Sequence, residues 1–130
     1  MNLSTTTESF GQDDQSWLAS AHGTDTARTI TLDTSAFTAG THYPNGYFPS
    51  GLPLGVITAT GKYGPYNNAS SDGTEVLAGL LFTAVDAPSV NTIDPQGALL
   101  WHGAVLASKL PIAVDTAGKA DVAGFIKFFA

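Results

Sequence analysis

Glycine and proline recur along the chain, and they constrain its fold more than any other feature. The 130 residues include 14 Gly and 7 Pro. Glycine weakens a helix and proline breaks it, whereas both are common in the turns that connect strands. The sequence therefore favours a protein made mainly of β-strands and turns. With 43% hydrophobic residues, the chain can build the core of one compact domain.

Alternating and apolar runs predict where the strands lie. In residues 28–33, polar side chains alternate with Ile30 and Leu32, which is typical of a strand with one buried face. Further strands are expected at 54–60, at 74–86 after the Asp72-Gly73 turn, at 98–106 and at 122–130. A short helical turn is expected within 112–121. We therefore predict a mainly β, small single domain with at most one or two short helices.

The first part of the chain is expected to be a flexible arm. Thr, Ser, Asp, Gln and Gly dominate residues 1 to about 28, and such a segment buries too little apolar surface to order alone. Trp17 and Leu18 form an apolar pair in this segment. Tryptophan is a favoured interface residue, so the pair indicates a partner. The alternative is that Trp17 folds back on its own domain.

Residues 41–53 form a block rich in turn residues and aromatic side chains. Pro44, Asn45 and Gly46 favour a tight turn, and Tyr43, Tyr47 and Phe48 surround it. One interpretation is a rigid loop that packs its aromatic rings on the core. The other is a contact surface built on a stiff loop.

The charge of the chain limits its partners. Five basic and 11 acidic residues give a net charge of −6, so nucleic acid, which needs clustered Lys and Arg, is not an expected partner. Up to Gly61, Arg28 is accompanied by five acidic residues, which indicates either ordinary solubility or a basic partner surface. The sequence has no Cys, no secretion signal and no membrane-spanning run, so we expect synthesis in a cytoplasm and no membrane partner.

The sequence offers little for catalysis. His22, His42 and His102 are too widely spaced to predict a metal pair, and His102 lies in an apolar strand. Asp72 and Glu75 flank a turn and are expected to be solvated there. No nucleophile motif or phosphate-binding loop is present. We therefore expect no enzyme, no catalytic residue, no metal and no cofactor.

Residues 71–86, SDGTEVLAGLLFTAVD, resemble the head decoration proteins of lambda-like tailed phages. In that family an Asp-Gly turn, two residues and a Val lead into small and aliphatic residues that end on Ala or Val and then Asp. The blocks at 105–111 and 123–126 also resemble that family. Those at 29–33 and 43–47 look like versions from phages of actinobacteria. The resemblance covers most of the chain beyond the arm.

The resemblance implies a β-clip/β-tulip-like homotrimer that binds the expanded phage head at its three-fold positions. It would stabilise the shell against the pressure of the packaged DNA, on the outer surface of the virion. Its partners would be the major capsid protein and further copies of itself. Residues 1–40 would form an extended capsid-binding arm, and residues 41–130 a trimerising core domain.

A flexible arm can bind by adding a strand to an exposed sheet edge, and the strand at 29–32 is the expected one. The expected capsid-binding residues are Trp17, Leu18, Arg28, Thr29, Ile30, Thr31 and Leu32. The candidate contact loop contributes Tyr43, Pro44, Asn45, Tyr47 and Phe48.

Two alternative functions come from other classes of protein. One is a β-sandwich module that binds carbohydrate or another surface through stacked rings. Its platform would consist of Tyr43, Tyr47, Phe48, Tyr63 and Tyr66. The other is a small hydrolase, which the lack of clustered His, Glu or Cys disfavours.

Overall fold

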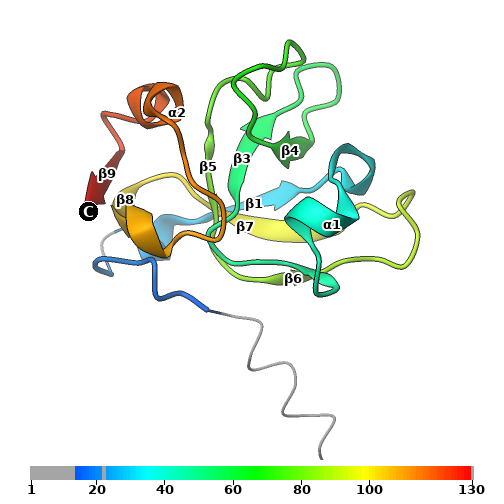
Figure 1. Ribbon diagram of the computed structural model, residues 1–130, viewed down its shortest axis with the longest axis horizontal. Coiled ribbons are helices and arrows are strands. Elements are labelled where there is room, and N and C mark those ends of the chain that lie inside the picture. Colours follow the sequence, from blue (N-terminus) through cyan, green and yellow to red (C-terminus); the bar gives the residue numbers. More distant parts are fainter. Residues whose placement is uncertain (1–13, 22, 130) are drawn as a thin grey trace, which may run out of the picture.

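The computed structural model describes residues 14–21 and 23–129, and the fold is mainly β (Figure 1). Residues 1–13 of the expected arm, together with His22 and Ala130, lie outside the described residues. The strands are β1 Arg28–Thr31, β2 Tyr47–Phe48, β3 Pro53–Val56, β4 Tyr63–Pro65, β5 Gly79–Leu81, β6 Val85–Asp86, β7 Gln96–Leu100, β8 Gly103–Leu106 and β9 Ile126–Phe129. The α-helices are α1 Ala39–His42 and α2 Thr116–Asp121, and the 3-10 turns are η3 Thr24–Thr26, η4 Thr34–Ala36 and η5 Ala107–Lys109. None of the helices in the described part of the chain has the length and apolar character needed to cross a membrane.

Five strands form one antiparallel sheet in the order β1-β7-β5-β3-β4. Its two outer strands approach each other at a parallel bridge between Leu32 and Tyr63, where the Asp33 N–H donates to the Tyr63 carbonyl at 2.9 Å. The sheet is therefore curled, and the two ends meet at one point. Strands β2 and β6 form a separate antiparallel pair, whereas β8 and β9 form a parallel pair.

Strands β5 and β7 lie at the centre of the sheet and carry buried leucines on both faces. Leu80 and Leu100 belong to one apolar cluster, and Leu81 and Leu99 belong to the other. Successive side chains of a strand point to opposite faces, so each leucine pair supplies both clusters. This explains why these segments are continuously apolar rather than alternating.

The predicted strand at 74–86 was wrong in its extent. Only β5 and β6 form within it, because the residues before β5 are held in turns. The Asp72 side chain accepts from the backbone N–H and the hydroxyl of Thr74, and Gly73 has a φ of +111°. The predicted segment at 98–106 divides into β7 and β8. The predicted helical turn is confirmed as α2, and the predicted terminal strand as β9.

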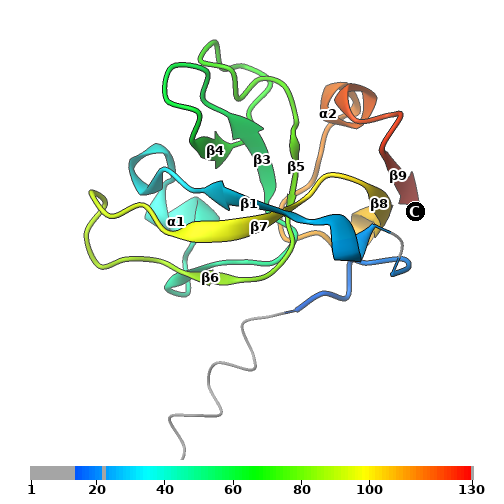
Figure 2. The same ribbon diagram turned by 180° about the vertical axis from the view of Figure 1, so that it is seen from behind.

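Residues 15–19 run along the edge of β8 opposite β9. The Leu106 N–H donates to the Trp17 carbonyl at 2.6 Å, and the Ala19 N–H donates to the Ala104 carbonyl at 3.0 Å. Figure 2 shows this segment and β1 against the body of the domain. The described part of residues 1–40 is thus built into the same sheets and clusters as residues 41–130.

Candidate functional site

Trp17 is fully buried in the apolar cluster to which β5, β7, β8 and β9 contribute. Its indole Nε1 donates to the Ser50 hydroxyl at 3.0 Å, and Ser50 donates in turn to the Phe82 carbonyl at 2.7 Å. The alternative in which Trp17 folds back on its own domain is therefore the one that the structure shows. Leu18, half-buried, packs against the same cluster and bridges to Val105.

Strand β1 places the other expected arm residues at the edge of the sheet. Ile30 and Leu32 point into the second apolar cluster and are 7% and 0% exposed. Arg28 and Thr29 are exposed, and Thr31 is half-buried. The side chains of Ile30 and Leu32 thus hold the strand to its own domain, whereas Arg28 and Thr29 face the solvent.

The candidate contact loop is divided between core and surface. Phe48 is fully buried, and its ring lies 4.8 Å from that of Phe37 and 4.9 Å from that of Tyr43. Pro44 and Asn45 are exposed at the turn. Each of the two sequence interpretations therefore describes part of the loop. Its aromatic rings at Tyr43 and Phe48 pack on the core, whereas its tip at Pro44 and Asn45 is exposed.

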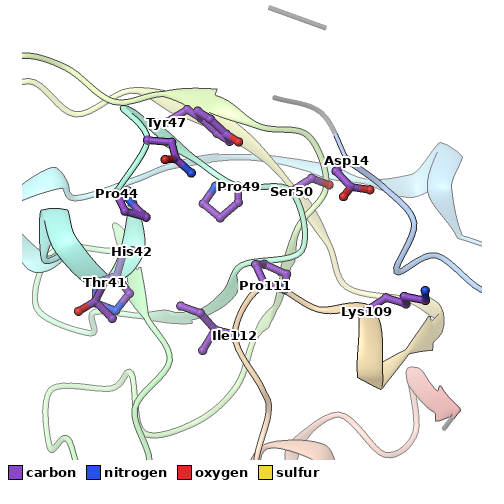
Figure 3. Close-up of a pocket in the computed structure, with 11 residues that line it drawn as sticks. Asp14, Thr41, His42, Pro44, Tyr47, Pro49, Ser50, Lys109, Pro111 and Ile112 are labelled. Carbon is purple, nitrogen blue, oxygen red and sulfur yellow. The ribbon is translucent and has the colours of Figure 1, made fainter. Parts of the chain in front are cut away.

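The exposed tip forms one wall of a cavity of about 280 Å³ (Figure 3). Asp14, Ser50, Lys109, Pro111 and Ile112 line the remaining walls together with residues of the loop. Sequence reasoning missed these residues. They come from three segments far apart in the chain, so no local pattern could have indicated that they meet.

Three titratable side chains that line this cavity lie at its opposite ends, with Asp14 and Lys109 at one end and His42 at the other. The Ser16 N–H donates to the Asp14 carboxylate at 3.0 Å, which lowers the pKa of Asp14. Burial lowers the pKa of His42, whose Nδ1 accepts the Thr38 N–H at 2.8 Å. Figure 3 shows His42 on the far side of the cavity from Asp14 and Lys109.

This arrangement provides binding groups rather than a reaction centre. The Ser50 hydroxyl lies in the wall, where it accepts from Trp17 and donates to the Phe82 carbonyl. A serine nucleophile would instead donate to a base. Among residues 14–21 and 23–129, no group of three or more His, Asp or Glu could hold a metal ion.

The rings proposed for a carbohydrate platform do not gather on one surface. Phe48 is 0% exposed and cannot stack on a sugar. Tyr66 packs against the cluster that contains Trp17, and its hydroxyl donates to Asp115 at 2.6 Å. Tyr43 and Tyr63 pack against the other cluster. A sugar-binding module therefore gains no support from their arrangement.

The fold and these surfaces define a small β-rich protein that exposes Arg28 and Thr29 on an outer strand of its main sheet. A family model described as Bacteriophage lambda head decoration protein D matches residues 18–123, and the chain belongs to this family. A search of curated proteins gave no match.

Family membership confirms the predicted resemblance and the general role. The chain is a structural capsid decoration protein, with its place on the capsid of the virion, and the family is not an enzyme family. The expected version from phages of actinobacteria stays a prediction. The match begins at Leu18 and includes β1, the contact loop and α2, so most of the surface described above lies within it.

Proposed function

We propose that the protein binds the expanded head as a homotrimer at its three-fold positions and stabilises the shell against internal DNA pressure. The major capsid protein is the partner, and binding takes place on the outer surface. The N-terminal segment and the exposed side of β1 supply the contact. The tip of the loop at Pro44 and Asn45 is a second contact surface.

The observation that carries this proposal is the outer edge of β1 around Thr29, before the chain meets β4 at the bridge between Leu32 and Tyr63. Strand β1 pairs with β7 along one side, with Ile30 opposite Gly97 and Thr29 opposite Ala98. The Leu32 N–H donates to Pro95 across the same ladder at 2.9 Å. Hydrogen-bonded pairs alternate along an antiparallel ladder, so the backbone groups of Thr29 point away from β7. This edge is suited to receive a strand from the capsid.

Three protomers make a weak contact effective. A single added strand binds weakly because ordering the segment opposes association. Linking three such contacts in one trimer raises the affinity by roughly 100- to 10,000-fold. If the capsid offers its strand only after expansion, binding stabilises the expanded shell by mass action.

The substitution Thr29→Pro tests this edge. Proline removes the outward N–H and leaves the hydrogen bonds of Ile30 to β7 in place, so the domain should fold. We expect the variant to lose binding to expanded heads by at least about tenfold per site, as the loss of a central main-chain contact implies. Cosedimentation of the variant with purified expanded heads measures this.

Thr29→Val is the matched control, because it keeps the N–H and the shape of the side chain. It should bind as the wild type does. Full occupancy of heads by Thr29→Pro, with an unchanged circular dichroism spectrum, would show that the β1 edge is not the capsid contact.

Deletion of residues 1–13 tests the N-terminal segment separately, because it keeps Trp17 with its bond to Ser50 and strands β1 to β9. The truncated protein should decorate expanded heads less completely. Heating decorated and bare heads in parallel tests whether the protein stabilises the shell. A protein that binds only the intact shell must raise the temperature at which the shell is disrupted. Equal disruption temperatures at full occupancy would contradict the stabilising role.

A further inference from the structure

Strand β9 and the residues before it carry an exposed surface that is both apolar and basic. Phe125 and Phe129 are 54% and 43% exposed. The Lys127 ammonium lies 5.5 Å from the centre of the Phe129 ring. Beside them is a hollow of about 370 Å³, whose lining includes the small residues Ala104, Ala123 and Gly124. We call Phe125, Lys127 and Phe129, with this hollow, the β9 surface.

A second surface is apolar and acidic. Val76 is 53% exposed and is preceded by Glu75. The neighbouring Leu77 N–H donates to the Asp121 carboxylate at 2.9 Å, which brings this acid beside Val76. We call Glu75, Val76 and Asp121 the Val76 surface. Its apolar centre and negative rim are complementary to the β9 surface.

Helix α2 separates the two surfaces. On one side, the Lys119 ammonium lies 5.7 Å from the centre of the Phe128 ring of β9. On the other side, Asp121 at the end of the helix holds the backbone of Leu77. The two surfaces therefore flank one helix instead of lying at opposite ends of the molecule, and Figures 1 and 2 both show α2 next to β9.

This placement matters for assembly. A contact between two different surfaces closes into a ring when the rotation between neighbours allows it, and otherwise forms a filament. Two neighbours that dock on either side of one helix approach from adjacent directions, as the members of a small ring do. Surfaces at opposite ends would instead extend the assembly along a line.

We propose that the β9 surface of one protomer binds the Val76 surface of a second copy of this chain, and that this contact closes the trimer. The inference rests on the proposed trimeric function and names its interface. Val76 enters the hollow between Phe125 and Phe129, while Lys127 faces the acidic rim of the neighbour. The exposed rings of Phe125 and Phe129 at the apolar strand β9 are thereby covered.

Substitution of Val76 by Asp tests the contact in the full-length protein. Burying an added carboxylate beside the acidic rim should raise the protein concentration needed for half-assembly by at least about tenfold. Sedimentation equilibrium over a range of concentrations measures this shift. Val90→Asp is the matched control, because Val90 is 49% exposed on the β6–β7 connection at the opposite end of the molecule from β9.

A charge exchange gives a second test that leaves the apolar residues unchanged. Lys127→Glu should weaken the trimer, and adding Glu75→Lys to the same chain should restore much of the loss, since each interface then regains an opposite pair. This pair of variants decides the question if Val76→Asp fails to fold by circular dichroism.

The outcomes separate the interface from the proposed function. A wild-type protein that stays monomeric at all concentrations and on the head would overturn the proposed trimer. A trimeric wild type whose Val76→Asp and Lys127→Glu variants assemble equally well would overturn this interface and leave the function standing. Variants that stay trimeric but no longer bind heads would show that these surfaces face the capsid, which also overturns the inference.

Discussion

At the scale of single residues, Trp17 connects the N-terminal segment to the domain. Its indole lies against Gly51, where an added Cβ would be 2.8 Å from Nε1, and Gly51 has a φ of +91°. The side chain thus depends on a glycine for space and on Ser50 for its hydrogen bond. This anchor adds to the backbone bonds that hold residues 15–19 along the edge of β8.

Ser50→Ala should destabilise the domain through this anchor. The substitution leaves the buried Trp17 N–H without its acceptor, which costs about 1–3 kcal/mol in the free energy of unfolding. Urea denaturation followed by tryptophan fluorescence measures the change. Ser89→Ala, at an exposed position of the β6–β7 connection, is the control and should unfold at the wild-type midpoint. A midpoint for Ser50→Ala that equals the control would mean that water replaces the acceptor.

At the scale of elements, the close contact of β5 with β7 organises the domain. Gly79 begins β5, and an added Cβ at this position would lie 2.4 Å from the Leu100 carbonyl oxygen. A side chain there would push apart the two strands that carry leucines into both clusters. The glycine therefore allows the two central strands to approach.

Gly79→Ala should reduce stability by about 1–3 kcal/mol, because backbone atoms of a central strand cannot move aside cheaply. Thermal unfolding followed by circular dichroism gives the shift. Gly40→Ala makes the same chemical change where nothing lies within 4 Å, and it should have little effect. Equal melting temperatures for the two variants would show that β5 and β7 adjust without strain.

At the scale of the whole molecule, the number of N-terminal segments per trimer should set the strength of capsid binding. Trimers assembled from full-length chains and chains lacking residues 1–13 would carry three, two, one or no segments. Affinity for expanded heads should fall stepwise through this series, by a total of roughly 100-fold or more, as multivalent binding requires. Native mass spectrometry of bound and unbound trimers measures the distribution.

If all four species bind expanded heads equally well, the affinity for the capsid comes from residues 14–130 and not from residues 1–13. The β1 edge and the loop tip would then be the whole contact. In that case the Thr29→Pro variant should still lose binding, so the two experiments separate the segment from the edge.

The sequence by itself determined the class of fold and the absence of an obvious reaction centre. Recurring Gly and Pro, the alternation around Ile30 and Leu32, and the apolar C-terminus are local features, and each follows from the preferences of its own residues. The family could be predicted from the segment at 71–86 because order and spacing are properties of the chain itself. The extent of the strand there could not, since the bonds of Asp72 to Thr74 hold the chain in turns.

Only the tertiary structure decided which apolar residues are available for partners. Trp17 is buried because Ser50 and Gly51, more than thirty residues away, supply an acceptor and space. The strand at Arg28–Thr31 is an edge because β7, far along the chain, takes its other side. Val76 and Phe125 stay exposed, although each is followed directly by a buried aliphatic residue, Leu77 and Ile126 respectively. Burial depends on contacts between distant segments, and such contacts leave no signal in a local pattern.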